Sequence, residues 1–446
     1  MLKRFTVENF SSYKDENRLE LTAGRTEMHP NHLVEFSKVK ILKSAILYGA
    51  NASGKSNLIK AMEYAKEIIL KNLDNVETYK KYFRLDSEKF SKPTQFKFEV
   101  ELDKRFFAYG FSVLLQQKEI EEEWLFEIGN TSPEMIFERK KNSITLGKIL
   151  KEKKIKNRFD IYSEDMKNQS HQLFLSEIAS KELEIEEIAI FNQLYDWFNK
   201  KLIVIYPNTT FGGISSISRD NKLSKIFKKY LHEFDTGIID ISSIDEDFEK
   251  SFKDLPSKVK QEIEKDLKKN IENSKKIKMT LQINGILYTI YKDGTGELKV
   301  QKLGLIHSKE IEDLFELKDE SDGTQRLFDL IPLISKFRED YTIVIDEFDR
   351  SLHPKLARKF FELFYSVVNS KSQLIVTTHE SNLLDLNLVR RDEIWFAEKD
   401  NNGASKLFTM NQFSVRYDSK IEKAYLLGRY GAVPIFKTFD EIEIEN

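Results

Sequence analysis

Apolar and polar positions over the first seventy residues indicate a strand, a glycine-rich loop and a helix. In residues 2–10, Phe5, Val7 and Phe10 alternate with charged side chains, which is the period of a half-buried strand. A second apolar run, Ser44–Tyr48, leads directly into a glycine-rich turn. The apolar residues that follow repeat at helical spacing and are Leu58, Ile59, Met62, Ala65 and Ile69. A strand, a tight loop and a helix are therefore predicted in succession.

The middle of the chain changes its period twice. From Phe96 to Leu146 apolar residues alternate with polar ones, which predicts an antiparallel meander with a turn at Asp103–Lys104. Residues 148–200 and 222–276 are highly charged and have helical periodicity, and the run at 202–207 between them predicts a buried strand. Residues 278–292 form a hairpin candidate that turns at Asn284–Gly285.

The C-terminal part contains two short, almost wholly apolar runs, Thr342–Ile345 and Gln373–Thr377. Such runs are typical of parallel strands that are covered on both faces. Residues 393–397 and 407–410 are expected to complete the same sheet. The pattern predicts an α/β nucleotide-binding core built from both ends of the chain. We expect three segments: an N-terminal lobe over 1–147, a largely helical insertion over 148–277, and a C-terminal lobe over 278–446.

Composition narrows the function classes. The chain has 446 residues, of which 40% are hydrophobic and 32% are charged, as in globular proteins. Its 71 basic and 73 acidic residues give a net charge of -2, which excludes a global polycation that grips nucleic acid. The chain has no cysteine, so disulfides, thiol nucleophiles and cysteine-ligated metals are excluded. No apolar run approaches the roughly 18 residues of a membrane span, so we expect a cytoplasmic protein without a membrane partner.

The strongest motif is G-x-x-x-x-G-K-S at residues 49–56, between the predicted strand and helix. Glycines let the backbone N–H groups surround a phosphate, and the helix N-terminus adds its positive dipole end. Lys55 would reach the β- and γ-phosphates of ATP, and the hydroxyl of Ser56 would ligate Mg²⁺. The candidate nucleotide-binding residues of this loop are Gly49, Asn51, Ser53, Gly54, Lys55, Ser56 and Asn57.

A second motif, Ile343–Glu347, brings two carboxylates to the tip of a predicted strand. Ligands collect at the carboxyl ends of parallel strands. Asp346 would hold Mg²⁺, and Glu347 would act as the general base for the attacking water. By itself an apolar run that ends in Asp-Glu is commonplace, but beside a phosphate-binding loop it predicts the second half of an ATP site.

Three further features indicate which kind of ATPase this is. Residues 320–326, Glu-Ser-Asp-Gly-Thr-Gln-Arg, open an apolar-periodic helix, and a helix N-terminus is an anion-binding end. Asp349 follows the carboxylate strand. His379 follows the next buried strand, which is expected to neighbour the Asp346 strand, so a contact with the γ-phosphate is predicted.

In this order the motifs resemble those of ABC-type ATPase heads, as in SMC proteins, DNA-repair ATPases such as RecF, and transporter subunits. The resemblance covers residues 1–75 and 315–400. It implies an α/β fold with a P-loop ABC-type ATPase head, an antiparallel β subdomain and a helical insertion. It also implies a head-to-tail homodimer, with a higher oligomer as the alternative, in which one chain's ATP-binding residues face Ser321 and Gly323 of the other. These ATP-binding residues are Lys55, Ser56, Asp346, Glu347 and His379, and Asp349 is a further candidate nucleotide-binding residue. The usual L-S-G-G-Q signature is altered here to Ser321-Asp322-Gly323-Thr324-Gln325.

Within that class, residues 47–58, 346–354 and 425–434 resemble the OLD-like ATPases of the AAA type in prokaryotes. This resemblance implies an ATPase subunit of an antiphage defence system, of the PARIS or RloB-associated type, that responds to a phage-encoded trigger. Its effector would be a TOPRIM-like nuclease. Only 67 residues follow His379, too few for a fused nuclease as well as the end of the sheet, so the effector is expected in trans.

Other functions stay open at this point. A RecF-like or SMC-like DNA-repair ATPase is one alternative, although neither helical stretch sustains the heptads of a long coiled-coil arm. A transporter ATPase subunit is another. The basic segment 139–158 either contacts a nucleic acid backbone or forms a solvated face, and Phe159 is the one aromatic side chain at its edge. His29 and His32 form a histidine pair that we expect to belong to an ordinary loop.

Overall fold

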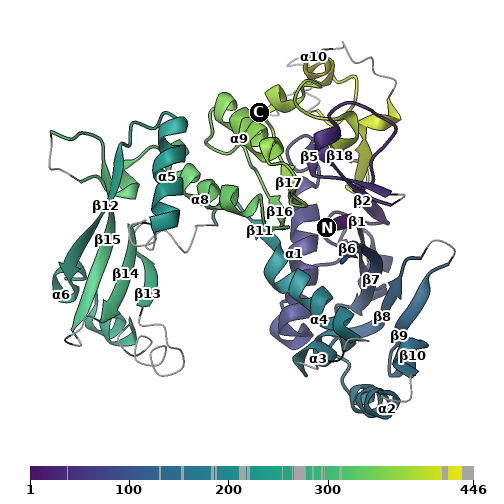
Figure 1. The fold of residues 1–446 in the computed structure, drawn as a ribbon. Coiled ribbons are helices and arrows are strands. Elements are labelled where there is room, and N and C mark those ends of the chain that lie inside the picture. Colours follow the sequence, from purple (N-terminus) through teal and green to yellow (C-terminus); the bar gives the residue numbers. More distant parts are fainter. Residues whose placement is uncertain are drawn as a thin grey trace, which may run out of the picture. The chain divides into compact units, whose positions relative to one another are not determined.

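The computed structural model describes most of the chain and divides it into two compact units. Unit 1 comprises residues 1–207, 337–349 and 357–446, and unit 2 comprises residues 208–336 and 350–356. Figure 1 labels most of the helices and strands of both units. The described residues are 1–37, 39–129, 132–151, 155–181, 185, 188–209, 217, 221–253, 255–263, 265, 278–283, 286–292, 295, 297–310, 314–413 and 420–433.

Unit 1 contains a six-stranded sheet in the order β11-β16-β17-β5-β18-β19 (Figure 1). The first five strands run parallel, and β19 closes the edge in the antiparallel direction. The bounds are β5 Ser44–Tyr48, β11 Leu202–Ile205, β16 Thr342–Ile345, β17 Gln373–Thr377, β18 Ile394–Lys399 and β19 Ser405–Thr409. Every residue of β5, β16 and β17 is buried, which explains why their runs are largely apolar. The strands predicted from these runs are confirmed.

A seven-stranded antiparallel sheet in unit 1 has the order β10-β9-β8-β7-β6-β1-β2. Its strands are β1 Leu2–Glu8, β2 Asn17–Glu20, β6 Thr94–Leu102, β7 Arg105–Leu114, β8 Glu119–Glu127, β9 Glu134–Lys140 and β10 Ser143–Leu146. The predicted meander and its turn at 103–104 are confirmed. The first strand joins this sheet, beside β6, and thus ties the N-terminus to the meander.

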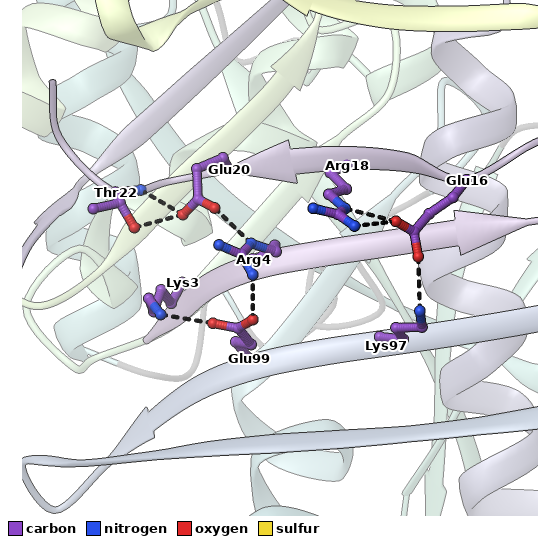
Figure 2. A network of polar contacts seen from close by, with 8 residues as sticks. All are labelled: Lys3, Arg4, Glu16, Arg18, Glu20, Thr22, Lys97 and Glu99. Atoms are coloured by element: carbon purple, nitrogen blue, oxygen red, sulfur yellow. Dashed lines mark hydrogen bonds and ion pairs between the residues drawn. The ribbon is translucent and has the colours of Figure 1, made fainter. Parts of the chain in front are cut away.

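Charged side chains cross the strands at one edge of this sheet. Figure 2 shows that Arg4 of β1 lies between Glu20 of β2 and Glu99 of β6, its direct partners in the strand register. Lys3 donates to the same Glu99, at 2.6 Å between Nζ and Oε2. Partly exposed ion pairs contribute at most about 1 kcal/mol each, so this network secures the register of the three strands more than it stabilises the unit.

One hydrophobic core joins the two sheets of unit 1 through helix α1, Lys55–Lys71. Its buried side chains, among them Leu58, Ile59 and Met62, pack with residues of β1, β6 and the parallel sheet. Further helices among the described residues of unit 1 are α2 Lys156–Asp165, α3 Phe174–Ser180, α4 Ala189–Asp196, the π-helical turn Trp197–Lys201 and α10 Ile421–Leu426. Helix α9, Pro354–Ser366, follows the carboxylate strand, and a short ladder pairs β3 Leu33–Phe36 with β4 Val39–Leu42.

Unit 2 contains a four-stranded antiparallel sheet in the order β12-β15-β14-β13. Its elements are α5 Asn221–Glu233, β12 Asp240–Asp247, α6 Phe248–Ser251, β13 Lys278–Ile283, β14 Ile286–Lys292, β15 Leu298–Ile306 and α8 Asp322–Lys336. The aromatic rings of Phe227 in α5 and Phe328 in α8 lie 5.2 Å apart. The predicted hairpin pairs as expected, and its turn at 284–285 lies outside the described residues.

These units differ from the three predicted segments. The described residues between 148 and 201 are largely helical and β11 is the strand predicted at 202–207, but both belong to unit 1. Strand β12 lies in a stretch that was expected to be helical. Ile238, Ile241 and Ile244 recur every third residue, and this spacing imitates a helix. Pairing with β15, more than fifty residues later in the chain, makes the segment a strand.

Candidate functional site

The candidate site lies at the carboxyl ends of β5, β16 and β17, where each strand is followed by one of the predicted motifs. Strand β5 ends at Tyr48, the loop 49–54 follows, and α1 begins at Lys55. Gly54 has a φ of 113°, and a Cβ atom there would lie 2.2 Å from the Oγ of Ser405. A Cβ at Gly49 would lie 2.4 Å from the carbonyl oxygen of Ala397. Both glycines are therefore required by close neighbours of the loop.

Lys55 points back into the loop that precedes it. Its Nζ donates to the carbonyl oxygens of Gly49 at 2.7 Å and Ala50 at 3.2 Å, and the side chain is buried. Desolvation lowers the pKa of Lys55 to about 8, against the opposing attraction of Asp346, Asp349 and Glu347. A buried ammonium bound only by neutral carbonyls is a cation that an anionic group could engage.

The loop and the carboxylate strand meet through Ser56 and Asp346. The Oγ of Ser56 donates to Oδ1 of Asp346 at 3.0 Å, across 290 positions of sequence. The hydroxyl of Thr377 donates to the same oxygen at 2.6 Å, and Asp346 is 3% exposed. A hydroxyl and a carboxylate are hard oxygen ligands of the kind that Mg²⁺ takes, so this pair fits a magnesium ion held together with phosphate oxygens.

Glu347 follows Asp346 with a φ of 46°, in the left-handed region that non-glycine residues seldom occupy. Its backbone N–H donates to the Oγ1 of Thr377 at 2.8 Å. The side chain is half-buried at the same end of the sheet. The sequence places Glu347 next to Asp346, but it does not predict this backbone conformation.

Asp349 and His379 come together as neighbours on the turns after β16 and β17. The backbone N–H of His379 lies 3.2 Å from both carboxylate oxygens of Asp349. The pKa of the exposed His379 is lowered by partial desolvation and by the positive charge of Lys55. Its strand lies directly beside the Asp346 strand, as predicted.

Residues that the sequence analysis did not select hold the loop from outside. Ser405 is buried, and its Oγ donates to the carbonyl oxygen of Ser53 at 2.7 Å and lies 2.7 Å from the Oγ of Ser12, whose hydroxyl can donate to it. The hydroxyl of Tyr13 donates to the carbonyl oxygen of Gly54 at 3.1 Å. No motif marks these residues, because they lie far from the loop in sequence.

Two of the predicted nucleotide-binding residues have other surroundings in the structure. The amide of Asn57 donates to the Oγ of Ser12 at 2.8 Å, so this side chain helps to fix the loop. Asn51 is exposed at the tip of the loop. Their contact with a nucleotide stays a prediction.

Ser321 and Gly323 lie in unit 2, at the start of α8. The Oγ of Ser321 accepts the backbone N–H of Thr324 at 3.2 Å, which makes Ser321 the N-cap of this helix. A Cβ at Gly323 would lie 2.8 Å from the carbonyl oxygen of Ser351. The close approach of the chain after the carboxylate strand thus requires a glycine.

The C-terminal aromatic stretch packs behind the loop. The rings of Tyr425 and Tyr430 stack on Phe396 of β18, at 5.7 and 5.9 Å between centroids, and Tyr425 also contacts Tyr48 of β5. Gly428 follows α10 with a φ of 74°, as expected for a helix C-terminus. Residues 425–433 therefore pack against β5, the strand that precedes the phosphate-binding loop. Pro434 lies outside the described residues.

The basic segment 139–158 is partly unavailable to nucleic acid. Arg139 is fully buried, and its guanidinium donates to the carbonyl oxygens of Lys141, Gln169 and Gln172. Phe159 is also fully buried and therefore cannot stack on a base. Lys153 and Lys154 lie outside the described residues. For Arg139 and Phe159 the nucleic-acid interpretation is wrong.

Of the histidine pair His29 and His32, His32 packs in the interior of unit 1. His32 is buried, its ring stacks on Tyr365 at 3.5 Å between centroids, and its Nδ1 lies 3.0 Å from Glu393. The described part of the chain contains no group of three or more side chains that could hold a metal by themselves. None of its helices is long and apolar enough to cross a membrane.

The fold and this site define a class: an α/β P-loop ATPase head with an antiparallel β subdomain. The chain belongs to the family described as "AAA domain, putative AbiEii toxin, Type IV TA system", whose model matches residues 44–385. That range contains the loop, the carboxylate strand, the helix that begins at Asp322, and His379.

Among solved structures, the chain is similar to SMC heads. The SmcHead bound to the C-winged helix domain of ScpA aligns with a TM-score of 0.39 at 14% identity, over 92% of this chain and 97% of that chain. The SMC head domain from Thermotoga maritima aligns with a TM-score of 0.36 at 11% identity, over 93% and 99%. The Smc head domain bound to the C-terminal domain of ScpA from Pyrococcus furiosus aligns with a TM-score of 0.33 at 15% identity, over 96% and 98%. No curated protein matches the chain.

Proposed function

We propose that the chain binds ATP with Mg²⁺ at the carboxyl end of the parallel sheet and hydrolyses it. The single observation that carries this proposal is the hydrogen bond between Ser56 of the loop and Asp346 of the carboxylate strand. It brings the two halves of an ATP site together from positions 290 residues apart, with Lys55 and Glu347 as their immediate sequence neighbours.

In this proposal the loop binds the phosphates. The N–H groups of residues 49–54 and the N-terminus of α1 face the β- and γ-phosphates, and Lys55 exchanges its two carbonyl partners for phosphate oxygens. Ser56 and Asp346 would hold Mg²⁺, which when bound neutralises charge on the phosphate oxygens. The exposed His379 contacts the γ-phosphate from the neighbouring strand.

Glu347 acts as the general base. As the water oxygen bonds to the γ-phosphorus, the bond from that phosphorus to the bridging oxygen of ADP breaks, and Glu347 accepts the proton that the water loses. The products are ADP and inorganic phosphate, and the proton leaves Glu347 for solvent. Asp349 positions His379 through the backbone N–H that it accepts.

The active assembly is proposed to be a head-to-tail homodimer. Ser321 caps α8, and the N–H groups at the start of that helix form an anion-binding end. In a pair of chains this end would contact the γ-phosphate bound by the other chain, together with Gly323. Two ATP molecules would then lie between the two copies.

The biological role is proposed to be antiviral defence of the abortive-infection type. The family description, which names a toxin of a type IV toxin–antitoxin system, supports a role in growth control. Every reaction residue identified in the chain serves phosphoryl transfer to water, so the damage would come from an effector in trans, such as a TOPRIM-like nuclease. Toxicity in cells should then require the neighbouring effector gene and a phage-encoded trigger, whereas toxicity of this chain alone would contradict the role.

The ATP-binding part of the proposal is tested with two lysines of the same helix. Lys55→Ala should weaken the binding of ATP at least about a hundredfold, because a phosphate-binding cation and its buried site are lost. Lys60→Ala, an exposed position one and a half turns further along α1, should bind like the wild type. Fluorescence titration with a labelled ATP analogue measures both. Equal affinity of the two variants would refute the assigned site.

A further inference from the structure

We propose that Thr377 is a positioning residue for ATP hydrolysis. It sets the geometry of the carboxylates of Asp346 and Glu347. Thr377 is the last residue of β17 and is fully buried. It touches neither a nucleotide nor a reacting atom in this proposal, and acts only through Asp346 and Glu347. The inference rests on the proposed function, because it assumes that these two residues serve ATP hydrolysis.

Thr377 contacts three consecutive residues of the neighbouring chain segment. Its Oγ1 donates to Oδ1 of Asp346 at 2.6 Å and accepts the backbone N–H of Glu347 at 2.8 Å. Its carbonyl oxygen accepts the backbone N–H of Phe348 at 2.9 Å. The ladder between β16 and β17 ends one residue earlier, at the pair Ile345 and Val376. Thr377 therefore holds the segment 346–348 in place directly after the last residue pair between β16 and β17.

The two bonds of the hydroxyl fit together chemically. A hydroxyl has one hydrogen to donate and lone pairs to accept with, so it can serve a carboxylate and an N–H group at once. The bond to Asp346 involves an ionised acceptor and is therefore of the stronger kind. Ser56 donates to the same Oδ1 atom, so the two hydroxyls fix the rotamer of Asp346 from two sides.

The backbone of Glu347 also depends on Thr377. A φ of 46° is uncommon for a residue with a Cβ, and such a conformation persists only where the surroundings hold it. Thr377 accepts hydrogen bonds from the backbone N–H groups of Glu347 and Phe348. These two groups lie on either side of the Cα atom of Glu347. The direction in which the Glu347 side chain leaves the backbone is thus set by one residue of the next strand.

The neighbouring Thr378 offers a matched comparison. It is equally buried, and its hydroxyl accepts the backbone N–H of Glu380, in the turn that follows β17. Loss of this hydroxyl removes one partly buried hydrogen bond but leaves the contacts of Asp346 and Glu347 with Thr377 in place. A merely structural role of buried hydroxyls would make the two threonines equivalent.

The experiment compares Thr377→Val, Thr377→Ser and Thr378→Val. Valine keeps the branched shape and removes the hydroxyl; serine keeps the hydroxyl. Thr377→Val should lower kcat about a hundredfold, as small misplacements of reacting groups do, while the affinity for ATP in EDTA stays within about threefold of the wild type. Thr377→Ser should retain kcat within about fivefold, and Thr378→Val should match the wild type.

A second readout does not depend on turnover. Since Thr377 fixes Asp346, the gain in ATP affinity on adding Mg²⁺ should be lost in Thr377→Val and kept in Thr377→Ser. If Thr377→Val does not fold, as shown by its thermal unfolding, Thr377→Ala replaces it in both assays.

The proposal is overturned if Thr377→Val keeps both kcat and the Mg²⁺-dependent gain within about threefold. It is equally overturned if Thr377→Ser is as impaired as Thr377→Val, since packing of the methyl group would then explain the loss. A wild-type chain that binds ATP with Mg²⁺ but does not hydrolyse it would instead refute the proposed ATPase, and the Mg²⁺-dependent binding would still decide the role of Thr377.

Discussion

At the scale of single residues, the buried cation of the loop has the largest consequence for pH dependence. Lys55 has a pKa of about 8, whereas an exposed lysine titrates near 10.5. Between these values the unfolded chain binds more protons than the folded one, so the contribution of Lys55 to stability rises with pH in that window. Below pH 8 the folded protein carries the buried charge, which is the form that phosphates need.

The affinity for ATP should therefore fall as the pH rises above about 8, by up to tenfold per pH unit. The reason is that the neutral amine must take up a proton to bind a phosphate. Titrations between pH 7 and pH 9.5 measure this slope. The residual binding of Lys55→Ala should be flat over the same range, and an equally flat wild-type profile would contradict the assigned role of Lys55.

Arg139 gives a second prediction at this scale. Its guanidinium is buried against three carbonyl oxygens, and the carboxylate of Glu123 is the main attraction on its charge. Removing one member of a buried polar network leaves the others without partners. Arg139→Met should therefore lower the free energy of unfolding by about 3 kcal/mol.

The control for this variant is Arg158→Met, an exposed arginine of the same basic segment. Its effect on stability should stay within about 0.5 kcal/mol. Denaturant unfolding measures both values. Equal stability of the two variants would show that the buried contacts of Arg139 contribute nothing to the stability of the fold.

At the scale of elements, the edge strand β19 fixes the phosphate-binding loop. The hydroxyl of Ser405 donates to the carbonyl of Ser53 and is also hydrogen-bonded to the hydroxyl of Ser12. Its Oγ is the nearest atom to a Cβ built at Gly54. The loop therefore depends on a hairpin from the other end of the chain. A loop held in one conformation binds phosphates without having to order itself first.

Ser405→Ala should weaken ATP binding about three- to tenfold, because the loss of hydrogen bonds worth about 1 kcal/mol each lets the Ser53–Gly54 peptide move. Thr409→Ala, on the same strand but bonded to Ile394, is the matched control and should bind normally. Isothermal titration calorimetry distinguishes the two. Unchanged affinity in Ser405→Ala would mean that the loop keeps its shape without β19.

Helices and strands that are determined by residues close together in the sequence could be predicted. The strand, loop and helix at residues 44–71 follow one another directly, so the motif and its context reinforce each other. The neighbouring positions of Asp346 and His379 also followed, from two apolar runs of the kind that pair in parallel. Their roles in ATP hydrolysis stay predictions.

What depended on pairing between distant segments could not be predicted. Thr377 looks like any strand residue until β17 lies beside β16, and Ser405 lies more than three hundred residues from the loop that it holds. Arg139 belongs to a basic run, but the alternation of β9 turns it inward. Strand β12 has helix-like isoleucine spacing and becomes a strand only through β15.

At the scale of the whole molecule, the residues of the proposed ATP site are divided between the two units. Lys55, Asp346 and His379 lie in unit 1, and Ser321 and Gly323 lie in unit 2. In the proposed dimer each ATP would be bound by unit 1 of one chain and contacted by unit 2 of the other. The site is then complete only in a pair of chains.

Mixing Lys55→Ala chains with Ser321→Arg chains tests this arrangement. Both lesions fall on one seam of a mixed dimer and leave the other seam intact, so part of the ATPase activity should return relative to either variant alone. Phosphate release after subunit exchange measures the recovery. No recovery, although exchange is demonstrated with labelled chains, would indicate a self-contained site in each chain.

The assignment of Glu347 as the base of an ATP-hydrolysing site can be tested by comparing three forms of the chain. Phosphate release and ATP affinity are measured for the wild type, Glu347→Gln and Glu380→Gln, the last being a carboxylate that only caps the turn after β17. Glu347→Gln should lower turnover at least about a hundredfold and keep the affinity for ATP within threefold, since the amide fits the site but cannot accept the proton. Glu380→Gln should remain active. Hydrolysis by Glu347→Gln within a few-fold of the wild type would show that Glu347 is not the base.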